Sequence, residues 1–349
     1  MEYVKMRNAN KICIGEGIIQ KEWKAQMRKP KILVVGSLVM DLIVRTRRFV
    51  NAGETILGED FTTASGGKGA NQAVQAALLG ARVDMVGKVG NDDFGRQMLA
   101  SLNAHGVDTS RVMVTDESSS AIGNIQIQEN EQGTQNRIVV ISGANMLIRG
   151  EDVDYLKETI KDYDMVMLQL EIPMAINEAV AAYAYQAGVP VMMNSAPSAP
   201  LSAELLSHLT YISPNEHEAA DLVGFPVVTA ADCEKAIGIL IGRGVKHVLI
   251  TRGSEGAAFG SDEGVMFSPC VKADKVVDPT AAGDSFVGAF CTATCAGLRP
   301  KDALVFANHT ASITVSRMGA QPSLPGIDEV LVYMSSKGVD TARFANLKA

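Results

Sequence analysis

The sequence has few aromatic residues and lacks the long apolar runs of membrane proteins. Phenylalanine, tryptophan and tyrosine make up 5% of the 349 residues, whereas glycine alone occurs 32 times. No apolar segment reaches the roughly 18 uncharged residues of a membrane-spanning helix, so we expect no membrane partner. Hydrophobic residues still make up 47% of the chain, which is typical of a globular protein and excludes disordered and fibrous classes.

Positively charged residues are fewer than negatively charged ones. The 32 lysines and arginines are outnumbered by 39 aspartates and glutamates, which gives a formal net charge of −7, and no long basic run occurs. A protein that binds the phosphate backbone of a nucleic acid usually carries clustered positive charge. We therefore expect no nucleic-acid partner.

Cysteine is sparse, and its positions do not form a recognisable site. No CxxC pair occurs, and no histidines stand at the spacing of a zinc site. We interpret the cysteines as reduced thiols of a cytosolic protein, and we expect the pair at 291 and 295 to pack in the core of an apolar helix. The five are Cys13, Cys233, Cys270, Cys291 and Cys295.

A regular pattern of strands and helices begins only after the first 28 residues. Residues 1–28 are basic and have no continuous apolar core, so they do not form a secretory signal. We predict that they are an extension outside the fold and that residues 29–340 form one domain. The stretch KILVVGS, residues 31–37, then predicts a buried strand.

Strands and helices alternate along the rest of this domain. The pattern predicts an α/β fold, in which a central, mostly parallel sheet carries helices on both faces. The expected helices cover 71–81, 94–106, 176–188 and 233–244, and the further strands cover 83–90, 165–171, 189–194, 209–215 and 247–253.

Two stretches interrupt this alternation. Residues 42–65 and 121–142 alternate apolar and polar side chains with period two and contain turn signals. We interpret them as hairpin strands that form a small β lid over one edge of the domain. Because exposed strands of this kind tend to associate, we predict a homodimer in which two lids pack together.

The stretch SGGKGANQAV, residues 65–74, is a glycine-rich loop that leads into a helix. Such a loop lets the backbone approach a ligand closely, and the helix start supplies unpaired N–H donors. A tight turn between a strand and a helix, with no ligand, is the less favoured explanation of the glycines. The stretch matches neither the Walker A nor the GxGxxG pattern.

The stretch DPTAAGDSF, residues 278–286, precedes an apolar run that reads as a buried helix. Its small residues leave backbone N–H groups exposed at a helix N-terminus, which suits a transferring phosphoryl group. Asp284 would stay ionised there and could accept a proton from an attacking hydroxyl. The simpler alternative is that Asp284 only caps the helix.

These two stretches, in this order, resemble the signatures of the ribokinase-like, or phosphofructokinase B, family of sugar kinases. The stretches LQLEIP, SPNEHEA, TRGSEGA and VSRMGAQPS fall where members of the family have similar ones, and the resemblance covers residues 31–335. It implies the ribokinase-like fold and an ATP-dependent phosphotransferase that acts on an alcohol group of a sugar.

The resemblance also assigns roles to residues. Asp284 would be the catalytic base, and the N–H groups of Ala281, Ala282 and Gly283 would form an anion hole. The sugar hydroxyls would be bound by Asp284 together with Asp41, Gly67, Lys68, Asn71 and Glu171. The ATP side would be formed by Asn215, Thr251, Gly253, Gly256 and Asn308.

Two cations are implied as well. Glu218 would organise Mg²⁺ and its waters near the phosphates of ATP. A potassium ion would activate the enzyme from a site beside the anion hole, held mostly by backbone carbonyls. Its ligands would be Asp278, Thr280, Thr314, Arg317, Gly319 and Ser323.

The chemistry of a sugar supports this assignment independently. A sugar presents many hydroxyls, and carboxylates and amides bind them well. Asp41, Glu171 and Asn215 each follow a predicted strand, and ligands of open α/β sheets lie at the carboxyl ends of strands. An ordinary strand end or helix cap would explain each of these residues singly.

One position departs from the family pattern. An asparagine usually stands two residues before the pocket aspartate, and here Val39 replaces it. D-ribose, giving ribose 5-phosphate, is the expected substrate, and 2-deoxyribose or another sugar or nucleoside is the alternative. A sensor that has lost catalysis is disfavoured because the base, the anion hole and the family's N-x-x-E motif, formed here by Asn215 and Glu218, occur together. A nicotinamide-dependent dehydrogenase is disfavoured because its glycine fingerprint is missing.

Overall fold

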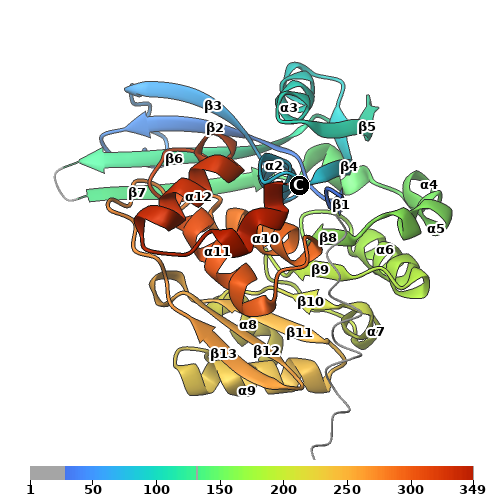
Figure 1. Ribbon diagram of the computed structural model, residues 1–349. Helices are drawn as coiled ribbons and strands as arrows, with labels where there is room; N and C mark the ends of the chain where they lie inside the picture. Colours follow the sequence, from blue (N-terminus) through green and yellow to red (C-terminus); the bar gives the residue numbers. More distant parts are fainter. Residues whose placement is uncertain (1–27, 131–132, 349) are drawn as a thin grey trace, which may run out of the picture.

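A computed structural model describes residues 28–130 and 133–348 (Figure 1). The predicted extension 1–28 therefore lies outside the described residues, apart from Arg28, and so does Cys13. The centre of the molecule is a nine-stranded sheet. Its strands, in spatial order, are β13 (Gly264–Ser268), β12 (Ala257–Ser261), β11 (His247–Thr251), β10 (Tyr211–Ile212), β9 (Val191–Asn194), β8 (Met165–Gln169), β1 (Lys31–Val35), β4 (Arg82–Gly90) and β5 (Val107–Thr115).

The large sheet is mostly parallel, as predicted. β1 pairs in parallel with β4 and β8, and only the β11–β12 and β12–β13 pairs are antiparallel. Alternate residues of β1 enter two separate hydrophobic clusters: Ile32 and Val34 join one, and Leu33 and Val35 join the other. This arrangement explains why the strand reads as a continuous apolar run, since both of its faces are covered.

Helices cover both faces of the large sheet (Figure 1). On the face of the first cluster lie α2 (Lys68–Leu78), α3 (Asp93–Ala104), α10 (Ala282–Cys295), α11 (Pro300–Thr314) and α12 (Ile327–Ser336). On the other face lie α4 (Gly150–Val153), α5 (Leu156–Thr159), α6 (Met174–Ala187), α7 (Ala203–His208), α8 (Glu216–Val223) and α9 (Ala230–Gly242). Short 3₁₀ turns are η1 (Gly143–Leu147), η2 (Ile160–Asp162), η3 (Gly253–Glu255), η4 (Gln321–Ser323) and η5 (Ala342–Lys348).

The predicted core position of the cysteine pair is confirmed. Cys291 is fully buried in α10, and Cys295 packs against the same hydrophobic cluster from the end of that helix. Burial raises the pKa of both thiols well above the ordinary range. All four described cysteines are free of disulfides.

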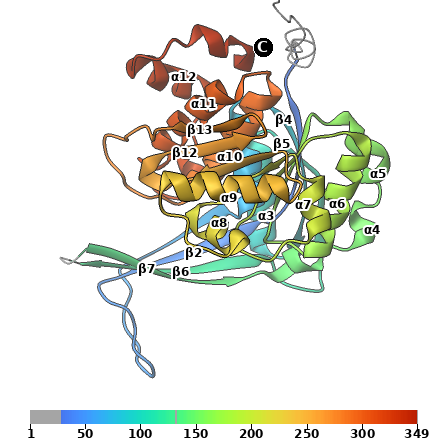
Figure 2. The same ribbon diagram turned by 90° about the horizontal axis from the view of Figure 1, so that it is seen from below.

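A second sheet forms the predicted lid, and we call it the lid sheet. Its order is β3 (Asp60–Gly66), β2 (Val39–Thr46), β6 (Ala121–Asn130) and β7 (Gly133–Ile141), and it extends away from the body of the molecule (Figure 2). The expected start at residue 42 is wrong, because β2 begins at Val39. Asp41 therefore lies inside a lid strand, not after a strand of the large sheet.

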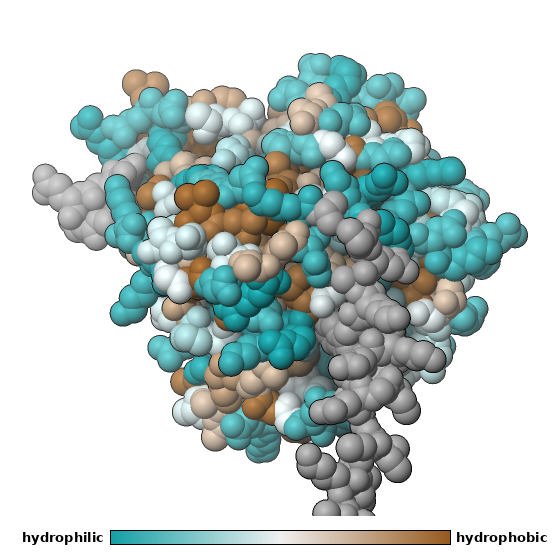
Figure 3. Space-filling view, in the orientation of Figure 1, coloured by the Kyte–Doolittle hydropathy of each residue, from teal (hydrophilic) through white to brown (hydrophobic). Residues whose placement is uncertain are grey.

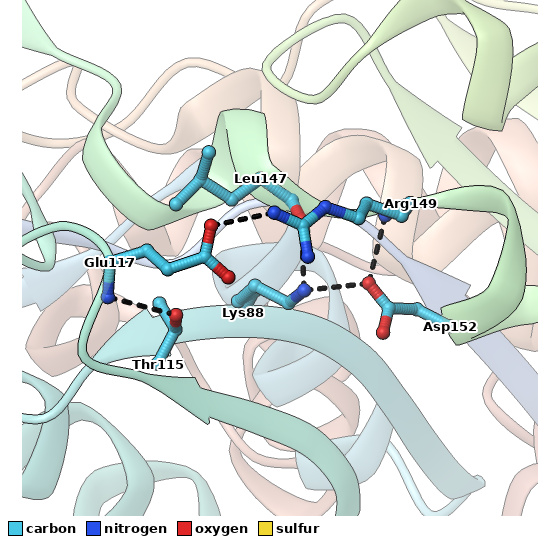
Figure 4. A network of polar contacts seen from close by, with 6 residues as sticks. All are labelled: Lys88, Thr115, Glu117, Leu147, Arg149 and Asp152. Carbon is cyan, nitrogen blue, oxygen red and sulfur yellow. Dashed lines mark hydrogen bonds and ion pairs between the residues drawn. The ribbon is translucent and has the colours of Figure 1, made fainter.

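The chain that returns from the lid sheet is tied to the body by a buried ion pair (Figure 4). Lys88 of β4, which is 7% exposed, donates to the Leu147 carbonyl at 2.8 Å and to Asp152 Oδ2 at 2.6 Å. Asp152 Oδ2 also accepts from the backbone N–H of Arg149 at 2.8 Å, and the Arg149 guanidinium pairs with Glu117. Because a buried ammonium is costly without such partners, these bonds favour the position in which residues 147–152 pack against β4.

Within residues 28–130 and 133–348, no helix is long and apolar enough to cross a membrane. The face in Figure 3 is covered mainly by hydrophilic residues, interrupted by small hydrophobic groups.

Candidate active site

A pocket of about 870 Å³ lies at the N-terminus of α10. It brings together residues from α2, β9, α8, β11, α10 and α11, which are far apart in the sequence. The predicted base and the predicted ATP-side residues share this one pocket. Among its lining residues are Lys68, Asn194, Asn215, Glu218, Thr251, Gly253, Gly256, Ala281, Ala282, Gly283, Asp284 and Asn308.

The backbone at the start of α10 is strained. Ala281, which precedes the helix, has φ 59° and is the one non-glycine residue with positive φ in the described part of the chain. This conformation costs an alanine roughly 1–2 kcal/mol, and such strain is concentrated at functional sites. The N–H of Ala282 donates to Pro279 O at 3.2 Å and is therefore engaged. The anion hole remains a prediction.

Two amides hold the Asp284 carboxylate, which is 7% exposed in the first turn of α10. Asn71 Nδ2 donates to Asp284 Oδ2 at 2.9 Å, and Gln72 Nε2 donates to Asp284 Oδ1 at 3.0 Å. Sequence reasoning selected Asn71 but missed Gln72. The available signal was a run of polar residues, Asn71, Gln72 and Gln75, among the small and apolar residues of this helix.

Asp41 lies between two glycines of the neighbouring lid strands. A β-carbon on Gly66 would come 2.7 Å from Asp41 Oδ2, and one on Gly123 would come 2.6 Å from Oδ1. Burial and the negative charges of Glu171, Asp278 and Asp284 raise the pKa of Asp41 to about 7. The lid sheet thus directs a crowded carboxylate toward the other acidic side chains.

Glu171 anchors the glycine-rich loop. Its Oε2 accepts from Ser37 Oγ and, at 3.0 Å, from the backbone N–H of Lys68. Gly67 has φ 91°, and a β-carbon there would lie 2.7 Å from Val39 N, so the close approach of loop and lid strand requires glycine. Glu171 thereby fixes the loop that brings Lys68 and Asn71 to Asp284.

Lys68 supplies positive charge among three carboxylates. Burial alone would lower the pKa of Lys68, but Asp284, Glu171 and Glu218 outweigh burial and raise it above its ordinary value. The ammonium therefore stays charged beside the base.

Asn215 and Glu218 form a reciprocal cap at the start of α8. Glu218 N donates to Asn215 Oδ1 at 2.8 Å, and Asn215 N and Nδ2 donate to Glu218 at 2.9 Å. Burial raises the pKa of Glu218, and a nearby cation would favour its ionised form. No three His, Cys, Asp or Glu side chains of the described chain gather into a complete metal site. Mg²⁺ here would keep water or phosphate ligands, as it usually does.

The far wall of the pocket is formed by the predicted ATP-side residues. Thr251 ends β11, and its N–H donates to Pro214 O at 3.0 Å. Gly256 has φ 91°, and a β-carbon there would clash with Ser268 O at 2.1 Å. Asn308 Nδ2 donates to Ser268 Oγ at 2.9 Å and ties α11 to the end of β13.

The residues predicted to bind potassium are brought together only in part. Asp278 Oδ1 accepts from the N–H and hydroxyl of Thr280, and Asp278 Oδ2 accepts from Gly319 N at 2.9 Å. Three side chains bond elsewhere, so any contribution from them would come through backbone carbonyls: Arg317 pairs with Glu329, Thr314 bonds to Thr310 O, and Ser323 bonds to Ala320 O.

Comparison with known proteins agrees with this geometry. Residues 29–327 match the pfkB family carbohydrate kinase model. The chain is 40% identical over 304 residues to ribokinase of Bacillus subtilis, covering 87% of this chain and 99% of that protein. It is 38% identical over 298 residues to ribokinase of Mus musculus, covering 84% and 91%.

A solved structure of Arabidopsis thaliana ribokinase complexed with ribose and ATP has the same fold. The TM-score is 0.82 at 34% sequence identity, with 88% of this chain and 99% of that chain covered. The family match spans well over half of the chain, and it includes both glycine-containing stretches and the pocket between them. The chain belongs to the pfkB family of carbohydrate kinases.

Proposed function

We propose that this protein is an ATP-dependent ribokinase that transfers the γ-phosphoryl group of ATP to the primary hydroxyl of D-ribose. The observation that carries the proposal is the Asp284 carboxylate, buried at the N-terminus of α10 and held by two amides beside the pocket. The sugar oxygen bonds to the γ-phosphorus, the hydroxyl proton passes to Asp284, and ADP leaves. The ribokinases of B. subtilis and Mus musculus support this choice of substrate.

Asn71 offers an acceptor for a sugar hydroxyl. Its Nδ2 is bonded to Asp284, while its Oδ1 is buried without a hydrogen-bond partner in the described part of the chain. A buried acceptor without a partner is costly, and a hydroxyl of the bound sugar would satisfy it. Asp41 and Glu171 contribute carboxylates, which accept hydroxyl protons in short hydrogen bonds.

Charge complementarity supports the proposed roles of the two cations and of Lys68. The positive end of α10 and the Lys68 ammonium face the position where negative charge develops during transfer. Glu218 would hold Mg²⁺ through water, and the bound ion would neutralise charge on the phosphates. A potassium ion would be held by carbonyls of the segments that Asp278 ties together.

The second candidate substrate is 2-deoxy-D-ribose, and Val39 favours it. Val39 is 5% exposed and stands two residues before Asp41 on β2, so both side chains lie on the same side of the strand. An apolar side chain cannot bond to a sugar hydroxyl, and apolar contacts discriminate weakly against a missing group.

The lid sheet supports the proposal of a homodimer. β7 is an edge strand, and Ile138, Val139, Val140 and Ile141 on it are each at least half exposed. A second copy would cover this edge by packing lid on lid. Light scattering at micromolar concentration should report a dimer, and a monomer would contradict the proposal. We also propose a cytoplasmic location, which the free state of the four described cysteines supports.

A coupled ADP-release assay with magnesium ATP and potassium tests the activity. D-ribose is compared with 2-deoxy-D-ribose and with small panels of hexoses and nucleosides, and Asp284→Asn is the negative control. We expect the highest kcat/KM with D-ribose. A preference for 2-deoxy-D-ribose would make Val39 the determinant of specificity. Silence on every sugar would overturn the proposed reaction and favour a sensor.

A further inference from the structure

We infer that Gln72 is a positioning residue for the base, because it ends a buried chain of amides that holds the Asp284 carboxylate in one orientation. The inference rests on the proposed role of Asp284. Gln72 is completely buried in α2, and its amide nitrogen and oxygen are both bonded to other side chains. It therefore acts on the reaction through Asp284.

The bonds of Gln72 join the base to the large sheet. Gln72 Nε2 donates to Asp284 Oδ1 at 3.0 Å and also to Asn194 Oδ1 at 3.1 Å. Gln72 Oε1 accepts from Gln169 Nε2 at 2.7 Å. Gln169 and Asn194 are the last residues of β8 and β9. A side chain 212 residues before the base thus links it to two rigid strand ends.

A backbone carbonyl determines how the amides of this hydrogen-bonded network are oriented. Asn194 Nδ2 donates to Ser213 O at 2.7 Å, and a carbonyl can only accept. Asn194 must therefore turn its Oδ1 toward Gln72, and the Gln72 amide nitrogen must donate to it. If the Gln72 amide were flipped, its oxygen would face two acceptors, Asn194 and Asp284. The network accordingly holds the donor side of Gln72 against the base.

Gln72 differs in this respect from Asn71, the other amide on Asp284. Asn71 Oδ1 is buried without a partner in the described part of the chain, so one polar atom of Asn71 is left for the proposed bond to the sugar. Both polar atoms of Gln72 are bonded to protein side chains. A base must stay within about 2.6–3.2 Å of the proton that it removes, and Gln72 keeps it in the required orientation.

The first test replaces Gln72→Met, which keeps the length of the side chain and removes its hydrogen bonds. We expect kcat to fall about 10- to 100-fold, while the KM values for D-ribose and magnesium ATP stay within about twofold, because Gln72 is completely buried and bonds only to protein side chains. A rise in KM with unchanged kcat would overturn the inference.

A matched control stands one helical turn away. Gln75 of α2 is also completely buried, and its amide bonds to Pro325 O at 3.0 Å and to Ser285 Oγ at 2.9 Å. Gln75→Met loses buried amide bonds of the same kind without touching Asp284. It should lower Tm much as Gln72→Met does but leave kcat within about twofold. An equal fall of kcat in both variants would assign Gln72 a merely structural role.

A double variant separates this inference from the proposed function. In the Asp284→Asn background, Gln72→Met should cause no further loss of kcat, because residues that act as a unit are not additive. An equal further loss would overturn the positioning role. High activity of Asp284→Asn alone would instead overturn the role of the base. If Gln72→Met does not fold, Gln169→Met is the alternative variant, because it removes the hydrogen bond from Gln169 to Gln72. This variant should still lower kcat about 3- to 10-fold. An unchanged kcat would contradict the inference.

Discussion

Gly123 of β6 lies opposite Asp41 of β2 in the lid sheet, so close that a β-carbon on Gly123 would come 2.6 Å from the Asp41 carboxylate. The atom in the way is the end of a side chain, which can move, whereas the strand backbone would stay in place. A residue larger than glycine at position 123 should therefore displace the carboxylate and leave the lid sheet intact.

Gly123→Ala tests this relationship. We expect the KM for D-ribose to rise about 10-fold or more, with a small change in Tm. Gly238→Ala in α9 is the control, because nothing lies within 4 Å of a β-carbon there. That control should keep wild-type kinetics and gain up to about 1 kcal/mol of stability. An unchanged KM in Gly123→Ala would show that Asp41 does not bind the sugar.

The ionisation of Asp41 predicts a pH dependence of sugar binding. Its pKa is raised to about 7, so the carboxyl group is neutral below that pH and charged above it. The charged form accepts hydroxyl hydrogen bonds more strongly. The KM for D-ribose should rise as the pH falls from 8 to 6, as steady-state kinetics at fixed magnesium ATP would show. A flat KM over this range would contradict the prediction.

The same shift predicts that Asp41 destabilises the free protein. Because the pKa is 3.8 unfolded and about 7 folded, the folded state binds more protons between these values, and stability falls as pH rises through that window. Asp41→Asn should flatten this slope. At pH 8 it should raise the free energy of unfolding by on the order of 2–4 kcal/mol, and at pH 4 it should change little. Denaturant titrations at both pH values measure the free energy of unfolding of the variant and of the wild type. An equal gain in stability at both pH values would show that the ionisation of Asp41 is not its cause.

Asp284→Asn should lower kcat by about 10²- to 10⁴-fold, because the amide cannot accept the hydroxyl proton. The fold should be nearly unchanged, since Gln72 can still donate to the new carbonyl oxygen and Asn71, whose Oδ1 has no partner in the described part of the chain, can turn its amide and accept from the new Nδ2. Circular dichroism checks the fold, and the ADP-release assay measures kcat. A variant that keeps half of the wild-type activity would remove Asp284 from the mechanism.

Val39→Asn tests the specificity of the pocket. An amide at this buried position would gain a partner only in a sugar that carries the missing hydroxyl. The ratio of kcat/KM for D-ribose over 2-deoxy-D-ribose should therefore rise about 10-fold. In the absence of sugar the unpartnered amide should cost about 1–3 kcal/mol of stability. An unchanged ratio would mean that Val39 does not face the sugar.

Features of short range were predictable from the sequence. The parallel strands, the glycine-rich loop and the helix after Asp284 each depend on residues within one segment, because apolar periodicity and glycine conformations act locally. The edge strands β12 and β13 and strand β5 were not predicted, and the strand expected over 209–215 is far shorter than predicted. This strand, β10, has only two residues in the ladder, Tyr211 and Ile212, because the length of a ladder depends on the neighbouring strands and not on the apolar pattern of the segment alone.

The sequence by itself determined the class of fold and the family and was enough to predict Asp284 as the base, since these follow from local patterns and from two distinctive stretches. Only the tertiary structure decided that Asp41 belongs to the lid sheet and that Gln72 holds Asp284. Both relations join segments far apart in the chain: strand register places Gly123 against Asp41, and packing of α2 on α10 places Gln72 against Asp284. Pairing of this kind depends on how the segments pack together, and no single stretch of sequence records it.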